Sequence, residues 1–165
     1  AGITGSSPTG AAVFGGGIQF DPTISTALNA YDEGVFSPEL QGDTIAGSGW
    51  VHSINVGAYT RVGNRVFVSG RIVLSAASVD ATGGIVIANL PFTVKNGNNY
   101  WSAATISACT NMAVNIVEID GTARINSTFI QLNKRVAAST TTQAVLASDL
   151  TATTQLNFSC NYVVA

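Results

Sequence analysis

Hydrophobic and polar positions follow a β-strand pattern along most of the chain beyond residue 49. Two such stretches flank the dipeptide Gly63-Asn64, which favours a two-residue turn between paired strands. We therefore predict an antiparallel hairpin in which alternate side chains share a face. The positions expected to do so are His52, Ile54, Val56 and Ala58 before the turn and Val66, Val68, Ile72 and Leu74 after it.

Further strands are expected along the rest of the chain. An apolar run over residues 85–90 ends at Pro91, and another strand is predicted over residues 100–109. Residues 112–119 and 123–132 should pair across Asp120-Gly121, which is the strongest hairpin signal in the sequence. Residues 155–164 alternate strictly and form the last strand. No segment keeps a helical period with caps, so we predict an all-β fold, an antiparallel, jelly-roll-like β-sandwich of about eight strands.

The start of the chain has a different character. Residues 1–20 are rich in Gly, Ser and Thr, and such a stretch cannot bury enough apolar surface to fold alone. Residues 31–36 then place an acidic, glycine-containing turn between two aromatic side chains. A chain of 165 residues suffices for one core. We expect an extended N-terminal arm and hinge over residues 1–48 and one β-sandwich domain over residues 49–165.

Charge is scarce and unevenly distributed. Only 10% of the residues are charged while 46% are hydrophobic, a balance that indicates a surface partly covered by neighbouring molecules. All seven Lys and Arg residues lie beyond residue 60, whereas the acids before residue 52 are Asp21, Asp32, Glu33, Glu39 and Asp43. The acidic arm suits a site on a neighbouring subunit, and a solvated acidic loop is the alternative.

The distribution of basic and of apolar residues argues against two kinds of partner, nucleic acid and the membrane interior. The Lys and Arg residues form no cluster dense enough to neutralise several phosphates, so we do not expect nucleic-acid binding. No apolar run approaches the roughly 18 to 20 residues that a membrane span requires, so we do not expect membrane insertion.

Side chains that could carry chemistry are few. His52 is the one histidine, and its place in a predicted strand favours a structural role. Cys109 and Cys160 have no metal-ligand spacing, and Cys160 lies in the alternating final strand, where a reduced core thiol is favoured over a disulfide. Asp32 and Glu33 are adjacent, so in extended chain they point in opposite directions.

One further carboxylate pair needs weighing. Glu118 and Asp120 share a strand face, but the expected turn at Gly121 accounts for the aspartate. We therefore expect no enzyme activity, no metal site and no cofactor.

A polar loop before the strand at residue 100 offers a different kind of site. Adjacent aromatic rings beside several amides can stack on a sugar ring while the amides bond its hydroxyl groups. The candidate glycan-binding residues are Asn96, Asn98, Asn99, Tyr100 and Trp101. Packing in the core or against another subunit is the competing, and favoured, role for Trp101.

Several segments together resemble a module of tailed-bacteriophage tail fibres, tailspikes and capsid accessory proteins. The resemblance extends over most of residues 17–163 and departs from the usual pattern at Asn29, Ala30, Val35 and Ser37. The segments that carry it are Gly17-Ile18-Gln19-Phe20, Thr26-Ala27-Leu28, residues 31–38, residues 57–72, Asn89-Leu90-Pro91-Phe92, Ser148-Asp149-Leu150 and residues 156–162. It implies a virion structural protein, assembled in the host cytoplasm as a homotrimer of β-sandwiches.

Two virion roles are compatible with that resemblance. A capsid decoration or cement protein would dock on capsid subunits through its arm, and a tail-fibre tip would read host surface glycan. Because Ala1 is a residue often left after removal of an initiator Met, we expect a complete gene product, which favours decoration. The residues expected to bind other virion proteins are Phe14, Ile18, Phe20, Tyr31, Asp32, Glu33 and Phe36.

Overall fold

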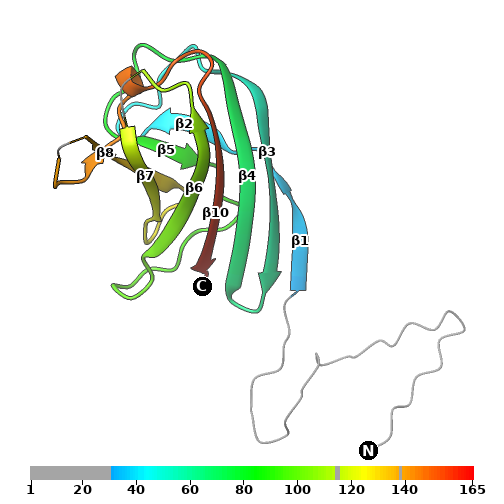
Figure 1. Cartoon of the computed structure of the whole chain (residues 1–165). Coiled ribbons are helices and arrows are strands. Elements are labelled where there is room, and N and C mark those ends of the chain that lie inside the picture. The colour runs from blue at the N-terminus through cyan, green and yellow to red at the C-terminus, as the bar shows by residue number, and fades with distance from the viewer. Residues whose placement is uncertain (1–30, 114–115, 138) are drawn as a thin grey trace, which may run out of the picture.

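The computed structural model describes residues 31–113, 116–137 and 139–165. Strands make up nearly all of the regular structure in these residues (Figure 1), with one short 3-10 helix, η1 (Ala147–Asp149). The described part holds no helix long and apolar enough to cross a membrane. In chain order the strands are β1 (Tyr31–Phe36), β2 (Glu39–Gly42), β3 (Val51–Val62), β4 (Arg65–Ala76), β5 (Ile85–Ala88), β6 (Ser102–Thr110), β7 (Ile116–Ala123), β8 (Ile130–Val136), β9 (Gln143–Ala144) and β10 (Gln155–Val163).

The strands form one antiparallel sheet in the order β1-β3-β4-β10-β6-β7-β8-β5-β2, with β9 beside β8. This sheet curls into a half-barrel, so that β2 and β5 lie behind β4, β10 and β6 in Figure 1. The predicted all-β, antiparallel class is confirmed. Since the strands belong to one continuous sheet of ten, the finer prediction of a jelly-roll-like sandwich of about eight strands is not confirmed.

The core lies inside the curl and draws on both halves of the sheet. Every second residue of β10 is buried, and so are Val66, Val68, Ile72 and Leu74 of β4, as the alternation predicts. All four residues of β5 are buried as well, which fits its wholly apolar sequence. The largest fully buried side chains are Tyr162, Leu40, Ile72, Leu74, Ile85, Ile87, Ile130, Leu132, Leu156, Val66, Val94 and Val145.

The hairpin at Gly63-Asn64 is confirmed, but the predicted face of β3 is wrong. Gly63 takes a φ of 61° in the two-residue turn. A register shift lies between His52 and Ile54, so His52 is opposite buried Leu74 whereas Ile54 is opposite Val73. A bulge of this kind sends the following side chains to the other face. Val56 is therefore 60% exposed instead of sharing the face of His52.

The predicted turn at Asp120-Gly121 is also wrong. Strand β7 runs straight through both residues, and Gly121 pairs with Ala104 on one side and Leu132 on the other. A Cβ on Gly121 would lie 2.7 Å from Cγ2 of Ile130, so this glycine allows close packing. The chain turns later, at residues 124–129.

The segment predicted as a hinge is part of the sheet. Residues 31–36 pair with β3, and residues 39–42 pair with β5 at the opposite edge. Only Ser37 and Pro38 separate these strands, so the chain crosses there from one edge of the sheet to the other. The described domain therefore already includes Tyr31, and the part of the predicted arm within residues 31–48 is built into it. Phe14, Ile18 and Phe20 lie outside the described residues.

An aromatic ring of β1 and one of β10 pack against each other over a pair of glycines. Phe36 pairs with Gly57, Gly57 with Gly70, and Gly70 with Phe158, in one row across four strands. A Cβ on Gly57 would lie 2.5 Å from the Phe36 ring, and one on Gly70 would lie 2.6 Å from the Phe158 ring. The two rings meet edge to face with centroids 6.3 Å apart. The glycines thus provide the space in which the rings pack.

One ion pair is enclosed by the domain. Lys134 of β8 binds the carboxylate of Asp149 in η1, and their side chains are 9% and 5% exposed. The same carboxylate accepts the N–H of Leu146 at 2.8 Å. Because water reaches neither charge well, removal of one partner would leave the other charge buried and uncompensated.

Candidate functional site

The predicted partner-binding residues of β1 divide between the two faces of the strand. Phe36 packs against the core, whereas Tyr31 is 66% exposed. The hydroxyl of Tyr31 donates to Oε2 of Glu33 at 2.7 Å, and this bond raises the pKa of the tyrosine. Asp32 accepts a hydrogen bond of 3.2 Å from the hydroxyl of Tyr59. The two acids therefore belong to different local contacts, as their opposite directions predicted.

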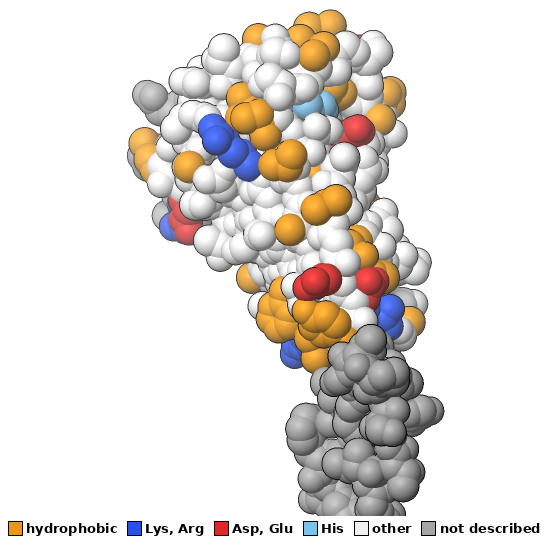
Figure 2. Space-filling model, turned by 90° about the vertical axis from the view of Figure 1, so that its right-hand side faces the viewer, with side chains coloured by type: hydrophobic (Ala, Val, Ile, Leu, Met, Phe, Trp, Pro, Cys, Tyr) orange, Lys and Arg blue, Asp and Glu red, His pale blue; other side chains and the backbone are white. Residues whose placement is uncertain are grey.

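The solvent side of β1, β3, β4, β10 and β6, here called the outer face, carries few charges. Val35, Val56 and Phe67 are 85%, 60% and 50% exposed on it. Two shallow depressions, of about 360 and 500 Å³, lie over these strands. Figure 2 shows the side of the molecule with β1 and β3, where apolar side chains are scattered among uncharged ones and a few charged ones. A row of mostly small side chains crosses the face, namely Val35, Ala58, Ser69, Ser159 and Thr105.

The candidate glycan-binding loop lies at the end of the domain where β10 ends (Figure 1). Its backbone is tied there by the N–H of Lys95, which donates to the carbonyl of Val163 at 2.8 Å. The three amide side chains are exposed, and they belong to Asn96, Asn98 and Asn99. The structure therefore keeps the predicted amides on one surface loop beside the two aromatic residues.

The aromatic rings of this loop differ in what they offer a ligand. The Tyr100 ring packs at Gly97, where a Cβ would lie 3.1 Å from it, and the ammonium of Lys95 is 5.0 Å from its centroid. Trp101 is 48% exposed, and the guanidinium of Arg124 lies 5.5 Å from its ring centroid. Trp101 is thus the more available stacking surface, and glycan binding at this loop stays a prediction.

His52 links β3 to the edge strand β2, although the two strands lie far apart in the order of the sheet. Its Nε2 accepts the backbone N–H of Leu40 at 3.1 Å, although Leu40 belongs to β2 and His52 to β3. Burial lowers the pKa of His52, and the nearby Glu39 carboxylate acts in the opposite direction. A neutral imidazole that accepts a backbone hydrogen bond is the structural strand histidine that the sequence predicted.

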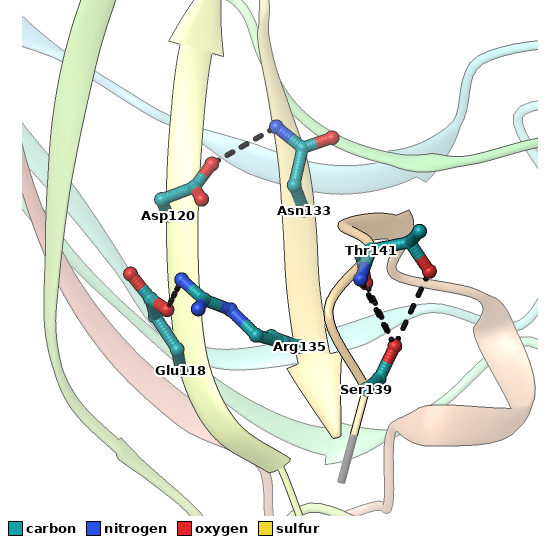
Figure 3. Close-up of polar contacts among 6 residues, drawn as sticks. All are labelled: Glu118, Asp120, Asn133, Arg135, Ser139 and Thr141. Atoms are coloured by element: carbon teal, nitrogen blue, oxygen red, sulfur yellow. Dashed lines mark hydrogen bonds and ion pairs between the residues drawn. The ribbon is translucent and has the colours of Figure 1, made fainter. Parts of the chain in front are cut away.

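The carboxylates on β7 also have structural partners. Figure 3 shows both acids on one side of β7, bound to side chains of β8, and a loop held by its own hydrogen bonds. Glu118 forms an ion pair with Arg135, and Oδ1 of Asp120 accepts a hydrogen bond of 3.0 Å from Asn133. The residues drawn are Glu118, Asp120, Asn133, Arg135, Ser139 and Thr141. Asp120 therefore serves a cross-strand pair and no turn.

Both cysteines are free thiols, as expected. Cys160 is 7% exposed in the core, and burial raises its pKa to about 11. Burial also raises the pKa of Cys109. A thiol that stays protonated is a poor nucleophile, so Cys160 acts as a small apolar side chain.

The sequence did not predict a cleft of about 280 Å³ that lies at the end of the domain opposite to the candidate glycan-binding loop. It is lined by residues of β2, of the start of β3 and of the connection between them: Glu39, Leu40, Gln41, Ala46, Gly47, Gly49, Trp50 and His52. Trp50 donates its Nε1–H to the carbonyl of Ala46 at 2.8 Å, which fixes the indole in this loop. The one signal in the sequence is a tryptophan directly after Gly47-Ser48-Gly49, at the position where the predicted strand pattern begins.

Hydrogen bonds to Asp80 hold this connection in place. Its carboxylate accepts the N–H and the hydroxyl of Ser48 at 2.7 and 2.6 Å and the hydroxyl of Ser78 at 2.6 Å. These bonds, with Ser48 contributing most, hold the pKa of Asp80 far below its usual range. The N–H groups of Thr44 and Ile45 donate to the carbonyl of Thr82. The wall of the cleft is therefore fixed before any ligand arrives.

Comparison with known proteins gives one similar fold. No protein-family profile matches the sequence, and a search of curated proteins also finds no match. The fold is similar to part of the Dettilon tailspike protein, known from a crystal structure, with a TM-score of 0.61 and 15% sequence identity. The match covers 81% of this chain and 24% of the tailspike chain. The chain therefore shares its curled, all-β fold with about a quarter of a tailspike protein.

Proposed function

We propose that this chain is a structural protein of a bacteriophage virion and belongs to the tail. The observation that carries the proposal is the likeness to a tailspike over 81% of the chain. It is supported independently by the segments of the sequence that resemble phage tail-fibre and tailspike modules. The shared part is a small fraction of the tailspike, so the proposed role is that of one module in a tail assembly.

We propose further that three copies associate through the outer face. Val35, Val56 and Phe67 expose apolar surface there, with the small, uncharged Ala58 and Ser69 between them and Arg71 beside Val56. Burial of these exposed apolar side chains between copies would remove them from water, which favours association. A charge placed in this face would need to be desolvated in the assembly, so it should weaken the association.

Light scattering tests this assembly. The expected mass is three times the 16.9 kDa of the chain, and a mass near one chain at micromolar concentration contradicts it. Val56→Lys should shift the protein toward monomer. Val79→Lys is the matched control, because Val79 is 99% exposed in the connection between β4 and β5 and lies off the outer face.

Immunogold electron microscopy of virus particles tests the location. Label on the tail is the expected result. Particles that carry no label would overturn the virion role, and label spread over the head would replace the tail with the capsid. Free protein should also compete with particles for adsorption to host cells if the module is a receptor-binding tip.

Capsid decoration is the second candidate, and the composition of the N-terminal region favours it. Residues 1–20 are rich in Gly, Ser and Thr, which suits a segment that docks on a neighbour, although four of the five acids before residue 52 belong to the folded domain. If the decoration role holds, removal of residues 1–20 should leave the trimer intact and abolish attachment to particles. Attachment that survives the truncation would exclude the arm as the anchor.

A further inference from the structure

The cleft at the β2–β3 connection has the dimensions of a small-ligand site. Its volume of about 280 Å³ lies just below the range of roughly 300–1,000 Å³ for such pockets, which suits one sugar ring and is too small for a longer unit. The β2–β3 connection, which supplies half of its lining, lies at the end of the domain opposite to the start of β1 (Figure 1). The cleft is therefore far from the start of the described chain.

Polar side chains in the cleft are available to a ligand. Glu39 and Gln41 are alternate residues of β2, so both side chains project from the same side of that strand. Within the part of the chain that the structure describes, neither side chain has a hydrogen-bond partner, and both are partly buried. A carboxylate accepts from two hydroxyl groups, and an amide donates and accepts, which are the contacts that a polyol needs.

His52 and Trp50 add a donor and an apolar wall. The Nε2 atom of His52 accepts from Leu40, so the neutral ring carries its proton on Nδ1, which is a further donor beside the cleft. Trp50 is held by its bond to Ala46, and its indole lines the cleft. Sugars bind by stacking the C–H groups of one ring face on an aromatic ring while hydroxyls bond polar groups.

The charge of the cleft selects among sugars. Glu39 is the one charged side chain in its lining, so an anionic sugar would meet an uncompensated negative charge. We propose that this cleft binds a neutral pyranose saccharide, with Trp50 as the stacking surface and Glu39 and Gln41 as the groups that bond hydroxyls. Hydrogen bonds to Asp80 and to the carbonyl of Thr82 already hold the wall of the cleft in place, so ligand binding should cost little conformational entropy of the protein.

Tryptophan fluorescence tests the proposal on the full chain. The chain has two tryptophans, so Trp101→Phe leaves Trp50 as the sole reporter. Methyl α-glucoside, methyl α-galactoside and methyl α-mannoside are the probes. At least one should change the emission saturably, with a Kd on the order of 1–10 mM, as befits a single ring. Glu39→Gln and Gln41→Ala should each weaken binding about 5-fold to 10-fold.

Matched controls make each outcome decisive. Glu118→Gln removes a carboxylate from β7 outside the cleft and should leave the affinity unchanged. The proposal is overturned if Trp50 emission does not respond to any probe up to roughly 50 mM, if Glu39→Gln binds as tightly as the parent protein, or if methyl glucuronate binds more tightly than the neutral probes. A response found only in a Trp50→Phe protein would assign binding to the loop of Trp101 instead. These measurements need no virus particle, so their result and that of the virion tests are independent.

Discussion

The hydrogen bond from Leu40 to His52 should stabilise the curl of the sheet in a pH-dependent way. The backbone of Leu40 is enclosed, with the residue 1% exposed, so loss of its acceptor leaves an N–H that water reaches poorly. An unsatisfied buried N–H costs about 1–3 kcal/mol, and partial access of water at His52 places this one in the lower half, at about 1–2 kcal/mol. His52→Leu should therefore lower Tm by about 3–8 °C.

His52→Gln is the matched variant, because the amide oxygen of glutamine can take the place of Nε2 and does not titrate near neutral pH. We expect it to retain most of the stability at about pH 7.5, where the histidine of the native chain is neutral.

Acidification should then separate the two proteins. Burial lowers the folded-state pKa of His52 below its ordinary value of about 6.5, so the unfolded chain binds the proton more readily. The stability that depends on the neutral ring is present above about pH 6.5 and is lost as the pH falls through the lowered pKa. Urea unfolding at about pH 7.5 and about pH 5.5 should show a larger loss in the native chain than in His52→Gln. Parallel losses in both proteins, or full stability of His52→Leu, would refute the reasoning.

Three other predictions concern stability and reactivity. Gly57→Ala should destabilise the domain by about 2–4 kcal/mol in chemical denaturation, because the new Cβ would overlap the ring of Phe36. Gly49→Ala is the control, since Gly49 has open space around it and the substitution should cost only about 1 kcal/mol for the positive φ. Equal losses in the two variants would contradict this. Lys134→Met should cost about 3–5 kcal/mol, since the carboxylate of Asp149 would stay buried without its partner, and a loss below about 1 kcal/mol in urea unfolding would contradict that dependence. In a variant whose other cysteine is serine, Cys160 should react with Ellman's reagent only after unfolding; rapid reaction of the native protein would show that the thiol is accessible.

Local sequence patterns were enough to predict the parts of the fold that local interactions determine. The turn at Gly63-Asn64 is such a case, because a residue with positive φ between two strands is a local requirement. The alternation of residues 155–164 is another, and the apolar positions Leu156, Phe158 and Tyr162 are all buried. In both cases, neighbours in sequence carry the whole signal.

Features set by distant partners escaped prediction. Gly121 has the local signature of a turn, but the methyl group of Ile130 and the neighbouring strand β6 make it a packing glycine. The bulge after His52 depends on pairing with β4, and it reversed the face of Val56. The cleft beside Trp50 depends on Asp80, which is 32 residues from Ser48 in the chain. Single-sequence reasoning had no means to bring those two residues together.

The direct passage of the chain from β1 to β2 has a mechanical consequence. A pull directed along β1 from its first residue would act in shear on six register pairs with β3, which must then yield together and not one by one. Through Ser37 and Pro38 the same load reaches the opposite edge, where four more pairs join β2 to β5. Tension on the N-terminal side is thus shared by both edges of the half-barrel. An edge strand is usually the first to peel away, but β1 should resist peeling because both sets of pairs hold it.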